Sequence, residues 1–422
     1  MQILGSILIS LVGIRLVLSI IESIRAQRVS VEQNRKRLRL LDEQISATRP
    51  SPTQRDRQHW KGYRKFRVDR KVLEADGICS FYLVPHDGKP LPDYLPGQFL
   101  TFRFQLPDPN SDKPKSVVRC YSLSDAPRSD YYRVTIKRVP PPPGIEAPAG
   151  RISNYFHDHV IEGDIIDVQA PRGDFSLDPT VSSPVVLIGG GVGVTPVLSM
   201  ANAILESGSQ EEVFFFLGVR CGREHPMRDH FRQLNEKYSN FHLIVCYSCP
   251  EESDQSEQDF HRKGRIDLNV IRESVKVCDL DFYICGPPPM MESLVPALKD
   301  WGVPSEKVHT EAFGPATVKR SSKSGSSVKR NANQSGQSDI TVEFSRSQSC
   351  HTWNGKYESL LEFALDQGVE LDSGCRAGSC GSCEVAVKRG EVEYTIEPSV
   401  EVGEGLCLAC IACPKTNLVI EA

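Results

Sequence analysis

The sequence predicts a multidomain chain: an antiparallel β-barrel, then a doubly wound α/β domain, then a small α+β domain. Three observations lead to this fold class. Between about residues 60 and 180, short runs of β-branched and aromatic residues follow one another without helical segments. From about residue 182, such runs alternate with segments of helical periodicity. The C-terminal part combines short strands, one amphipathic helix and a dense group of cysteines.

Length and composition agree with this division. A chain of 422 residues has room for two or three domains. The charged fraction of 25% and the hydrophobic fraction of 39% are those of an ordinary globular protein. A net charge of −4 contains no basic excess of the kind that nucleic-acid binding uses. Free thiols are typical of a reducing compartment.

Residues 1–24 are predicted to form a membrane anchor helix. The stretch from Ile3 to Ile21 is mostly apolar and has about the length needed to cross a bilayer. Basic residues follow directly, in the charged helix and linker predicted for residues 25–59, and place the globular domains in the cytoplasm. Arg15 is costly in the middle of a span, so a helix lying in the interface is an alternative to a transmembrane helix.

Residues 60–181 are expected to form the barrel, and two motifs within it predict a flavin site. The first contains an arginine whose fork suits a phosphate, a tyrosine that can pack on the flavin ring and a serine that can hydrogen-bond it. The second is a glycine turn that opens a helix, whose free amides can hold a pyrophosphate. The first motif is Arg119, Tyr121, Ser122 and Leu123, and the second is Gly150, Arg151, Ile152 and Ser153.

Together these motifs resemble the flavin domain of the ferredoxin reductase superfamily. The start of the helix at Gly150 favours FAD, and FMN stays open as the alternative.

Residues 182–316 are predicted to be a nucleotide-binding domain. The buried run Val185–Ile188 leads into a glycine turn and then a helix, which is a nucleotide-binding arrangement. The glycines let the backbone approach phosphates, and the helix start offers free amides, although the spacing is not G-x-G-x-x-G. The residues expected to bind here are Gly191, Gly193, Thr195 and Pro196.

The last predicted strand of this domain ends in Cys285, Gly286 and Pro287, at the sheet edge where ligands bind. A buried cysteine before a Gly-Pro turn is the plain alternative. The run resembles the C-G-P motif near the nicotinamide in the same superfamily. Glu311 and Phe313 resemble a glutamate and an aromatic residue that lie beside flavin and nicotinamide in flavohaemoglobin reductase domains. The resemblance implies catalytic roles for Ser122, Cys285 and Glu311.

Arg220 and Arg223 follow the second strand of this domain, where guanidinium groups can meet an adenosine 2′-phosphate. They can equally be solvated charges, so NADH and NADPH both stay open. The resemblance to flavohaemoglobins favours NADH.

Residues 317–338 are predicted to be a flexible linker, because they are almost entirely polar and small. Residues 339–422 are predicted to be an α+β domain with a hairpin, one helix over residues 357–366 and a small mixed sheet. This domain resembles the ferredoxin (β-grasp) fold.

The ferredoxin-like domain carries a C-x4-C-x2-C motif made of Cys375, Cys380 and Cys383, which is the plant-type spacing for a [2Fe–2S] cluster. A disulfide pair and a zinc site are the alternatives, but the four-residue gap is atypical of zinc ribbons. The resemblance to plant-type ferredoxins favours Cys410 as the fourth metal ligand. Cys413 matches the usual gap better, so a swap stays open.

Residues 60–422 as a whole resemble the single-chain reductases of the phthalate dioxygenase reductase type and their FAD-containing relatives. The resemblance implies hydride transfer from NADH or NADPH to the flavin, then single-electron transfer to the [2Fe–2S] cluster and on to a redox partner such as an oxygenase or a cytochrome. The alternative is a membrane-tethered redox sensor or an electron-transfer subunit with a degenerate nucleotide site.

Overall fold

The computed structural model describes residues 60, 62–108, 111–141, 150–178, 180, 183–312, 340–369, 371–376, 378, 381–396, 398, 400 and 402–422. The predicted membrane anchor and charged segment, residues 1–59, lie outside this part of the chain, and so does the predicted linker, residues 317–338. None of the helices described is long and apolar enough to cross a membrane. The anchor therefore stays a prediction.

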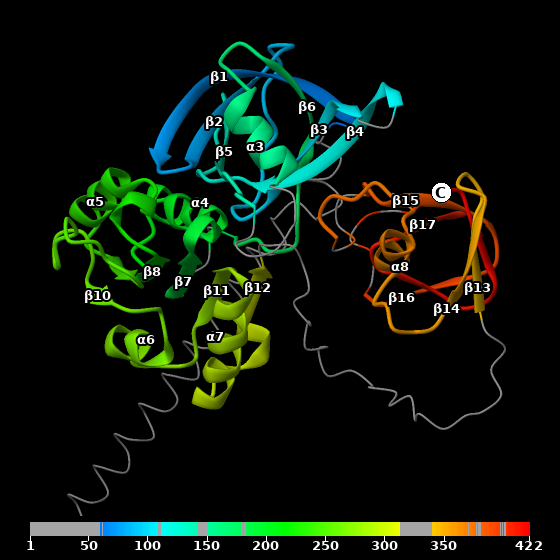
Figure 1. The fold of residues 1–422 in the computed structure, drawn as a ribbon. Helices are drawn as coiled ribbons and strands as arrows, with labels where there is room; N and C mark the ends of the chain where they lie inside the picture. The colour runs from blue at the N-terminus through cyan, green and yellow to red at the C-terminus, as the bar shows by residue number, and fades with distance from the viewer. Residues whose placement is uncertain are drawn as a thin grey trace, which may run out of the picture. The chain divides into compact units, whose positions relative to one another are not determined.

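The first domain is an antiparallel barrel, as predicted (Figure 1). Its sheet has the order β4-β3-β6-β1-β2-β5, and an antiparallel bridge between Leu123 and Val134 joins the two outer strands. A short helix, α3 (Arg151–Asp158), places Phe156 against the rings of Phe81 and Phe102 inside the barrel. The strands are β1 (Tyr63–Ala75), β2 (Ile78–Pro85), β3 (Phe99–Asp108), β4 (Ser111–Ser122), β5 (Tyr132–Lys137) and β6 (Ile165–Arg172).

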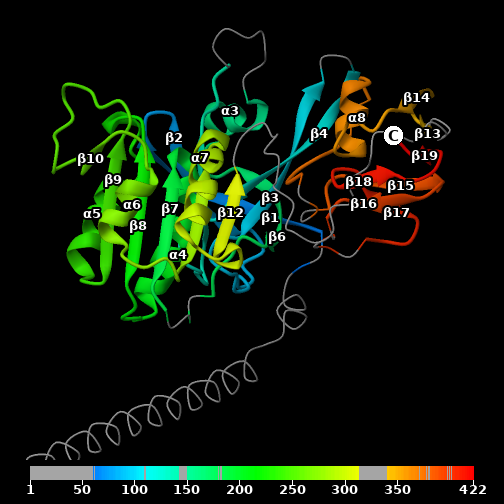
Figure 2. The same ribbon diagram turned by 90° about the horizontal axis from the view of Figure 1, so that it is seen from below.

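The second domain is a parallel sheet of order β10-β9-β8-β7-β11-β12, and this confirms the doubly wound prediction. Figure 2 shows β7, β8 and β9 running side by side. The strands are β7 (Val185–Gly190), β8 (Val213–Val219), β9 (Phe241–Tyr247), β10 (Arg262–Lys263), β11 (Asp281–Gly286) and β12 (Val308–Ala312). The helices are α4 (Val194–Glu206), α5 (Arg228–Lys237), α6 (Leu268–Ser274) and α7 (Pro288–Trp301).

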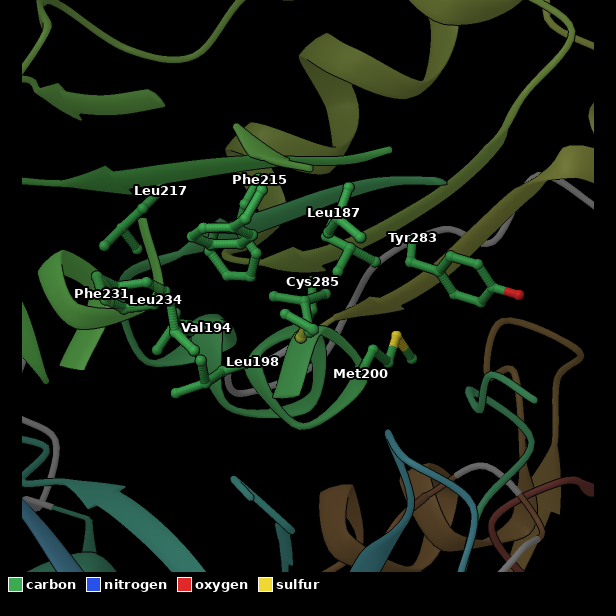
Figure 3. Close-up of a cluster of buried hydrophobic side chains, with 14 of the residues drawn as sticks. Leu187, Val194, Leu198, Met200, Phe215, Leu217, Phe231, Leu234, Tyr283 and Cys285 are labelled. Atoms are coloured by element: carbon green, nitrogen blue, oxygen red, sulfur yellow. The ribbon is translucent and has the colours of Figure 1, made fainter. Parts of the chain in front are cut away.

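Both faces of this sheet are apolar and covered by helices. On one face, Leu187 and Phe215 pack with Val194 and Leu198 of α4 and Phe231 of α5 (Figure 3). A separate core on the other face includes residues of α6 and α7, among them Ile271, Leu294 and Leu298. Two separate cores explain why the strands read as continuous apolar runs rather than as alternating patterns. The chain leaves β7 toward β8 on one side and β11 lies on the other, so the sheet reverses its order at β7.

The C-terminal domain contains a mixed sheet of order β14-β13-β19-β15-β17 and one helix, α8 (Leu360–Asp366). The helix begins later than predicted, because Ser359 accepts a hydrogen bond from the Glu362 amide and acts as the N-cap. The strands are β13 (Ile340–Phe344), β14 (Ser349–Trp353), β15 (Glu384–Arg389), β16 (Val392–Tyr394), β17 (Leu406–Leu408), β18 (Ala412–Pro414) and β19 (Leu418–Ile420).

Candidate functional site

The first flavin motif lies at the end of β4. Tyr121 turns its ring into the barrel and packs edge-on against Phe102 and Phe156, with centroid distances of 5.8 and 5.4 Å. Burial raises the pKa of Tyr121, so the phenol stays protonated. Burial lowers the pKa of Arg119, and among the described residues no carboxylate pairs with its guanidinium. An arginine without an acidic partner can bind a phosphate group.

The second flavin motif forms the start of α3. Gly150 is the N-cap residue, and no side chain caps the first amides of the helix. A Cβ at Gly150 would lie 2.5 Å from the Ser153 hydroxyl oxygen, so the turn needs glycine. The Ser153 hydroxyl donates a hydrogen bond to the Gly150 carbonyl at 3.1 Å, and Ile152 is buried. Both side chains therefore shape the turn, while the free amides after Gly150 suit a pyrophosphate.

The glycine turn of the nucleotide domain lies against the end of β11. Gly191 has a φ of +57°, the left-handed conformation that favours glycine. A Cβ at Gly193 would lie 2.4 Å from the Cys285 carbonyl oxygen, so only glycine allows this close approach. The Thr195 hydroxyl donates to the Val192 carbonyl at 3.0 Å and is buried with Pro196, so both residues hold the turn together.

The three residues predicted to be catalytic come from three strands and lie close together. Ser122, at the end of β4, donates to the Glu311 carboxylate at 3.5 Å. Glu311 on β12 pairs in register with Cys285 on β11. The motif continues through Gly286, whose position beside Met290 leaves only 2.4 Å for a Cβ, and Pro287, the N-cap of α7.

Cys285 itself is fully buried, and its side chain packs in the core beside Leu187 and Val194 (Figure 3). Burial, with a contribution from Glu311, raises the pKa of Cys285 well above its ordinary value. The side chain is therefore a neutral thiol, which is a poor nucleophile. Its catalytic role stays a prediction, and Phe313 lies outside the described residues.

The loops after β8 and β9 contain acidic residues that the sequence analysis did not connect with the nucleotide. Arg220 is exposed, but Arg223 donates to both oxygens of Glu251, at 2.5 and 2.9 Å. Asp254 accepts from the amides of Gly222 and Glu251 at 3.1 and 2.8 Å. The parallel register of β8 and β9 brings the two loops together, and that register is not visible in the sequence.

Cys375 and Cys383 of the C-terminal domain both act on Cys410, but among the described residues no group of three or more ligand side chains is close enough to hold a metal ion. The thiols of Cys383 and Cys410 are hydrogen-bonded to each other, Cys375 is close enough to act electrostatically on Cys410, and the Gly378 amide bonds Cys410. The bond with Cys383 first, then burial and the charges of Cys383 and Cys375, raise the pKa of Cys410, while the Gly378 amide lowers it. Gly378 and Gly381 have φ values of +74° and +71°, which lets the loop curl around the thiols. Cys375, Cys383 and Cys410 are the described members of the predicted [2Fe–2S] ligand set, and Cys380 lies outside the described residues.

The candidates for the fourth ligand have different surroundings. Cys413 lies in β18, and its thiol donates to the Glu358 carbonyl at 3.3 Å. Cys407 is buried in β17, and burial raises its pKa to about 12. The Cys410 thiol interacts with the Cys383 thiol. Cys410 as the fourth ligand stays a prediction, with Cys413 as the alternative.

Comparison with known proteins agrees with this arrangement. Residues 187–295 match the oxidoreductase NAD-binding domain family, and residues 349–415 match the 2Fe-2S iron–sulfur cluster binding domain family. The flavohaemoprotein of Halalkalibacterium halodurans is 41% identical over 263 residues, which are 62% of this chain. The flavohaem-like FAD/NAD-binding domain of nitric oxide dioxygenase from Vibrio cholerae is covered in full at 32% identity, over 60% of this chain, with a TM-score of 0.52. The chain belongs to the flavohaemoprotein-type FAD/NAD-binding reductases.

This reductase continues into a 2Fe-2S ferredoxin domain, which gives it the architecture of phthalate dioxygenase reductase. That structure, described as modular for electron transfer from pyridine nucleotides to [2Fe-2S], shares 26% identity and a TM-score of 0.50. The match covers 86% of this chain and 98% of the other. The cofactors of the reductase are accordingly FAD, NAD(P)H and a 2Fe-2S cluster. The chain spans 62% of the length of the curated H. halodurans flavohaemoprotein.

Proposed function

We propose that this reductase passes electrons from NAD(P)H through FAD and the 2Fe-2S cluster to a protein acceptor. When bound, the flavin accepts a hydride and releases electrons one at a time to the cluster. The observation that carries the proposal is the meeting of Ser122, from the flavin barrel, with Glu311, from the nucleotide domain. This contact joins the motif that would hold the flavin ring to the motif that would hold the nicotinamide ring.

The side chains of the chain supply binding and orientation. Arg119 and the free amides after Gly150 would hold the pyrophosphate of FAD. Ser122 is buried, so its hydroxyl can orient the flavin ring away from water, and Glu311 positions that hydroxyl. The Cys285 backbone lies beside the nucleotide turn, and its uncharged thiol packs in the core.

The acceptor that the architecture favours is an oxygenase or a cytochrome. Phthalate dioxygenase reductase is named for an oxygenase, and its likeness to this chain supports an acceptor of that class. A redox sensor, or a subunit with a degenerate nucleotide site, is the second candidate that the experiment below distinguishes.

The test is an anaerobic titration of the purified protein with NADH and, separately, with NADPH. Flavin absorbance and the electron paramagnetic resonance signal of the cluster are followed together. We expect one nucleotide to bleach the flavin and the reduced-cluster signal to follow. A flavin that stays oxidised with both nucleotides would overturn the proposal and favour the sensor or the degenerate subunit.

We further propose NADH as the preferred donor. The support is the pairing of the Arg223 guanidinium with the Glu251 carboxylate, which leaves Arg223 less able to bind a phosphate. The Asp254 carboxylate, which accepts from the Glu251 amide, lies next to this pair. Two carboxylates near the adenosine end disfavour a 2′-phosphate by charge repulsion, whereas a ribose hydroxyl can donate to them.

We also propose that residues 1–24 anchor the reductase to a membrane, with its domains in the cytoplasm. The support is the apolar stretch and the basic residues after it. Fractionation of the full chain and of a variant lacking residues 1–59 tests this. We expect only the full chain to sediment with membranes and to resist extraction by alkaline carbonate.

A further inference from the structure

A buried carboxylate stands three residues beyond Ser122. Asp125 has only 5% of its surface exposed, and it lies in the segment between β4 and β5. Its carboxylate accepts hydrogen bonds from the Tyr131 hydroxyl at 2.8 Å, the Ala126 amide at 2.9 Å and the Arg128 guanidinium at 3.3 Å. Buried polar groups of this kind are costly unless fully bonded, so the segment is held in one conformation.

Two further bonds lead from Asp125 into the nucleotide domain. The Asn202 side-chain amide donates to the Asp125 carboxylate at 2.9 Å, and the Ser199 hydroxyl donates to the Asp125 carbonyl. Ser199 and Asn202 are both fully buried on α4, the helix that starts from the glycine turn. The Nε2 of His230 lies 2.9 Å from the side-chain oxygen of Asn202, and the Asn202 nitrogen faces Asp125.

The spacing on α4 shows how the helix makes this connection. Ser199, Asn202 and Glu206 are three and four residues apart, so they form one stripe of the helix. Glu206 extends the stripe with two bonds of 2.7 Å to Arg128. Val194 and Leu198 of the same helix pack in the core of the sheet (Figure 3). The apolar side chains of α4 thus stabilise the nucleotide domain, while Ser199 and Asn202 hold the segment that follows the flavin motif.

Arg133 of β5 neutralises this buried site. Its guanidinium lies 3.7 Å from the Asp125 carboxylate and also donates to Ser124. Burial raises the pKa of Asp125, but Arg133, Tyr131 and Arg128 together lower it by more. The net pKa lies below its ordinary value, and the carboxylate stays ionised.

We propose that Asp125 is a positioning residue for hydride transfer, which fixes the flavin strand β4 relative to the nucleotide turn through Ser199 and Asn202. This inference rests on the proposed function. The Ser122–Glu311 hydrogen bond is long, at 3.5 Å, and therefore weak. It cannot by itself define the spacing of the two motifs. A displacement of about 1 Å between reacting groups costs on the order of a hundredfold in rate.

The experiment removes the crossing bonds without stripping the charges around Asp125. The variants are Ser199→Ala, Asn202→Ala and the double substitution. Lys137→Met is the matched control, because its 2.6 Å ion pair with Glu224 also links the two domains but does not touch β4. FAD content, NADH dissociation constant, the rate of flavin reduction at saturating NADH and amide hydrogen exchange of residues 120–127 and 194–203 are measured for each.

We expect the double variant to keep its FAD and its NADH affinity within about threefold, but to reduce the flavin about ten- to a hundredfold more slowly. Hydrogen exchange of both segments should rise, with and without bound cofactors, and the control should resemble the wild type. An unchanged reduction rate in a double variant that holds its FAD overturns the inference. If the double variant does not fold, the Ser199→Ala variant decides by the same readouts. A wild type that neither nucleotide reduces indicates instead that the proposed function is wrong.

Discussion

Single charged side chains in the loops after β8 and β9 set the expected nucleotide preference. Arg223 is bound by Glu251 through both carboxylate oxygens, and this pairing lowers the pKa of Glu251. The pair is exposed, so it contributes little to stability, and its importance lies in the charge that it presents to the nucleotide.

Replacing Glu251 by Gln is expected to raise the ratio of kcat/KM for NADPH over NADH about tenfold. The substitution removes a negative charge and releases Arg223 to bind a 2′-phosphate. Steady-state assays with both nucleotides measure the ratio. Glu273→Gln, which breaks the comparable exposed pair with Arg262, is the control. Equal losses with both nucleotides would contradict the assignment of this loop.

Single substitutions of Cys410 and Cys413 test which of the two is the fourth ligand of the cluster. Cys410→Ser is expected to lower the iron and sulfide content of the purified protein several-fold, because a thiolate ligand is lost from the site. Cys413→Ser should keep the cluster, since Cys413 is bonded to the Glu358 carbonyl instead. Metal analysis and electron paramagnetic resonance of the reduced protein measure both. Loss of the cluster in the Cys413 variant with retention in the Cys410 variant would reverse the assignment.

His225 makes the nucleotide domain sensitive to acid. Burial first, and Arg228 next, lower the pKa of His225 to about 3, while Asp259 opposes them and His261 adds to the lowering. Its Nδ1 contacts the Tyr247 hydroxyl at 2.8 Å, and its Nε2 is buried without a partner among the described residues.

Below the unfolded pKa of about 6.5, the unfolded chain takes up a proton that the folded chain excludes. The free energy of unfolding should therefore fall as the pH drops from 6.5 toward 3, by up to about 2 kcal/mol at pH 5. Urea unfolding at several pH values measures this, with His225→Asn expected to show a smaller loss. The exposed His242, replaced by Gln, serves as the control. The same pH dependence in wild type and His225→Asn would exclude this cause.

At the scale of elements, α3 is held from both ends. Its start carries the glycine turn predicted to face the pyrophosphate, and its C-terminal carbonyls are capped by Lys71 from β1. The Lys71 ammonium donates to the carbonyls of Phe156, His157 and Val160 at 3.3, 2.8 and 2.8 Å. A cation at this end also compensates the helix dipole.

Replacing Lys71 by Met is expected to destabilise the barrel by about 1–2 kcal/mol and to weaken FAD binding several-fold. The loosened helix can no longer hold its first amides in place. Thermal unfolding and the fluorescence of released FAD measure the two effects. Lys65→Met on the same strand is the control, because its 3.3 Å ion pair with Asp167 is exposed. Undiminished FAD affinity in a destabilised Lys71 variant would show that the cap does not align the site.

At the scale of the whole molecule, electrons must pass from the flavin domain to the cluster domain. The linker predicted for residues 317–338 lies between them in the chain. Deleting half of it is expected to slow cluster reduction at least several-fold without changing flavin reduction, because a shorter tether restricts the approach of the domains. Stopped-flow absorbance separates the two steps. Replacement of the same residues by Gly and Ser is the control, and a slower flavin step in the deletion variant would refute the tether.

Most of the architecture could be predicted from local patterns. The strand runs, the glycine turn after Val185–Ile188 and the C-x4-C-x2-C motif each depend on neighbours in the chain, and spacing along the chain records them directly. The barrel, the parallel sheet and the cluster domain were all predicted correctly on this basis. The start of α8 was predicted too early, because Tyr357 continues the apolar pattern while the cap at Ser359 decides the boundary.

The sequence by itself determined which residue types form each cofactor motif, because motif chemistry is local. Only the tertiary structure decided how the motifs meet. Strand register joined Arg223 to Glu251, and packing buried the Cys285 thiol. Folding brought Asp125 against Asn202, 77 residues later in the chain. Such contacts form because distant segments fill one another's space and satisfy one another's polar groups, and a linear pattern contains no record of either.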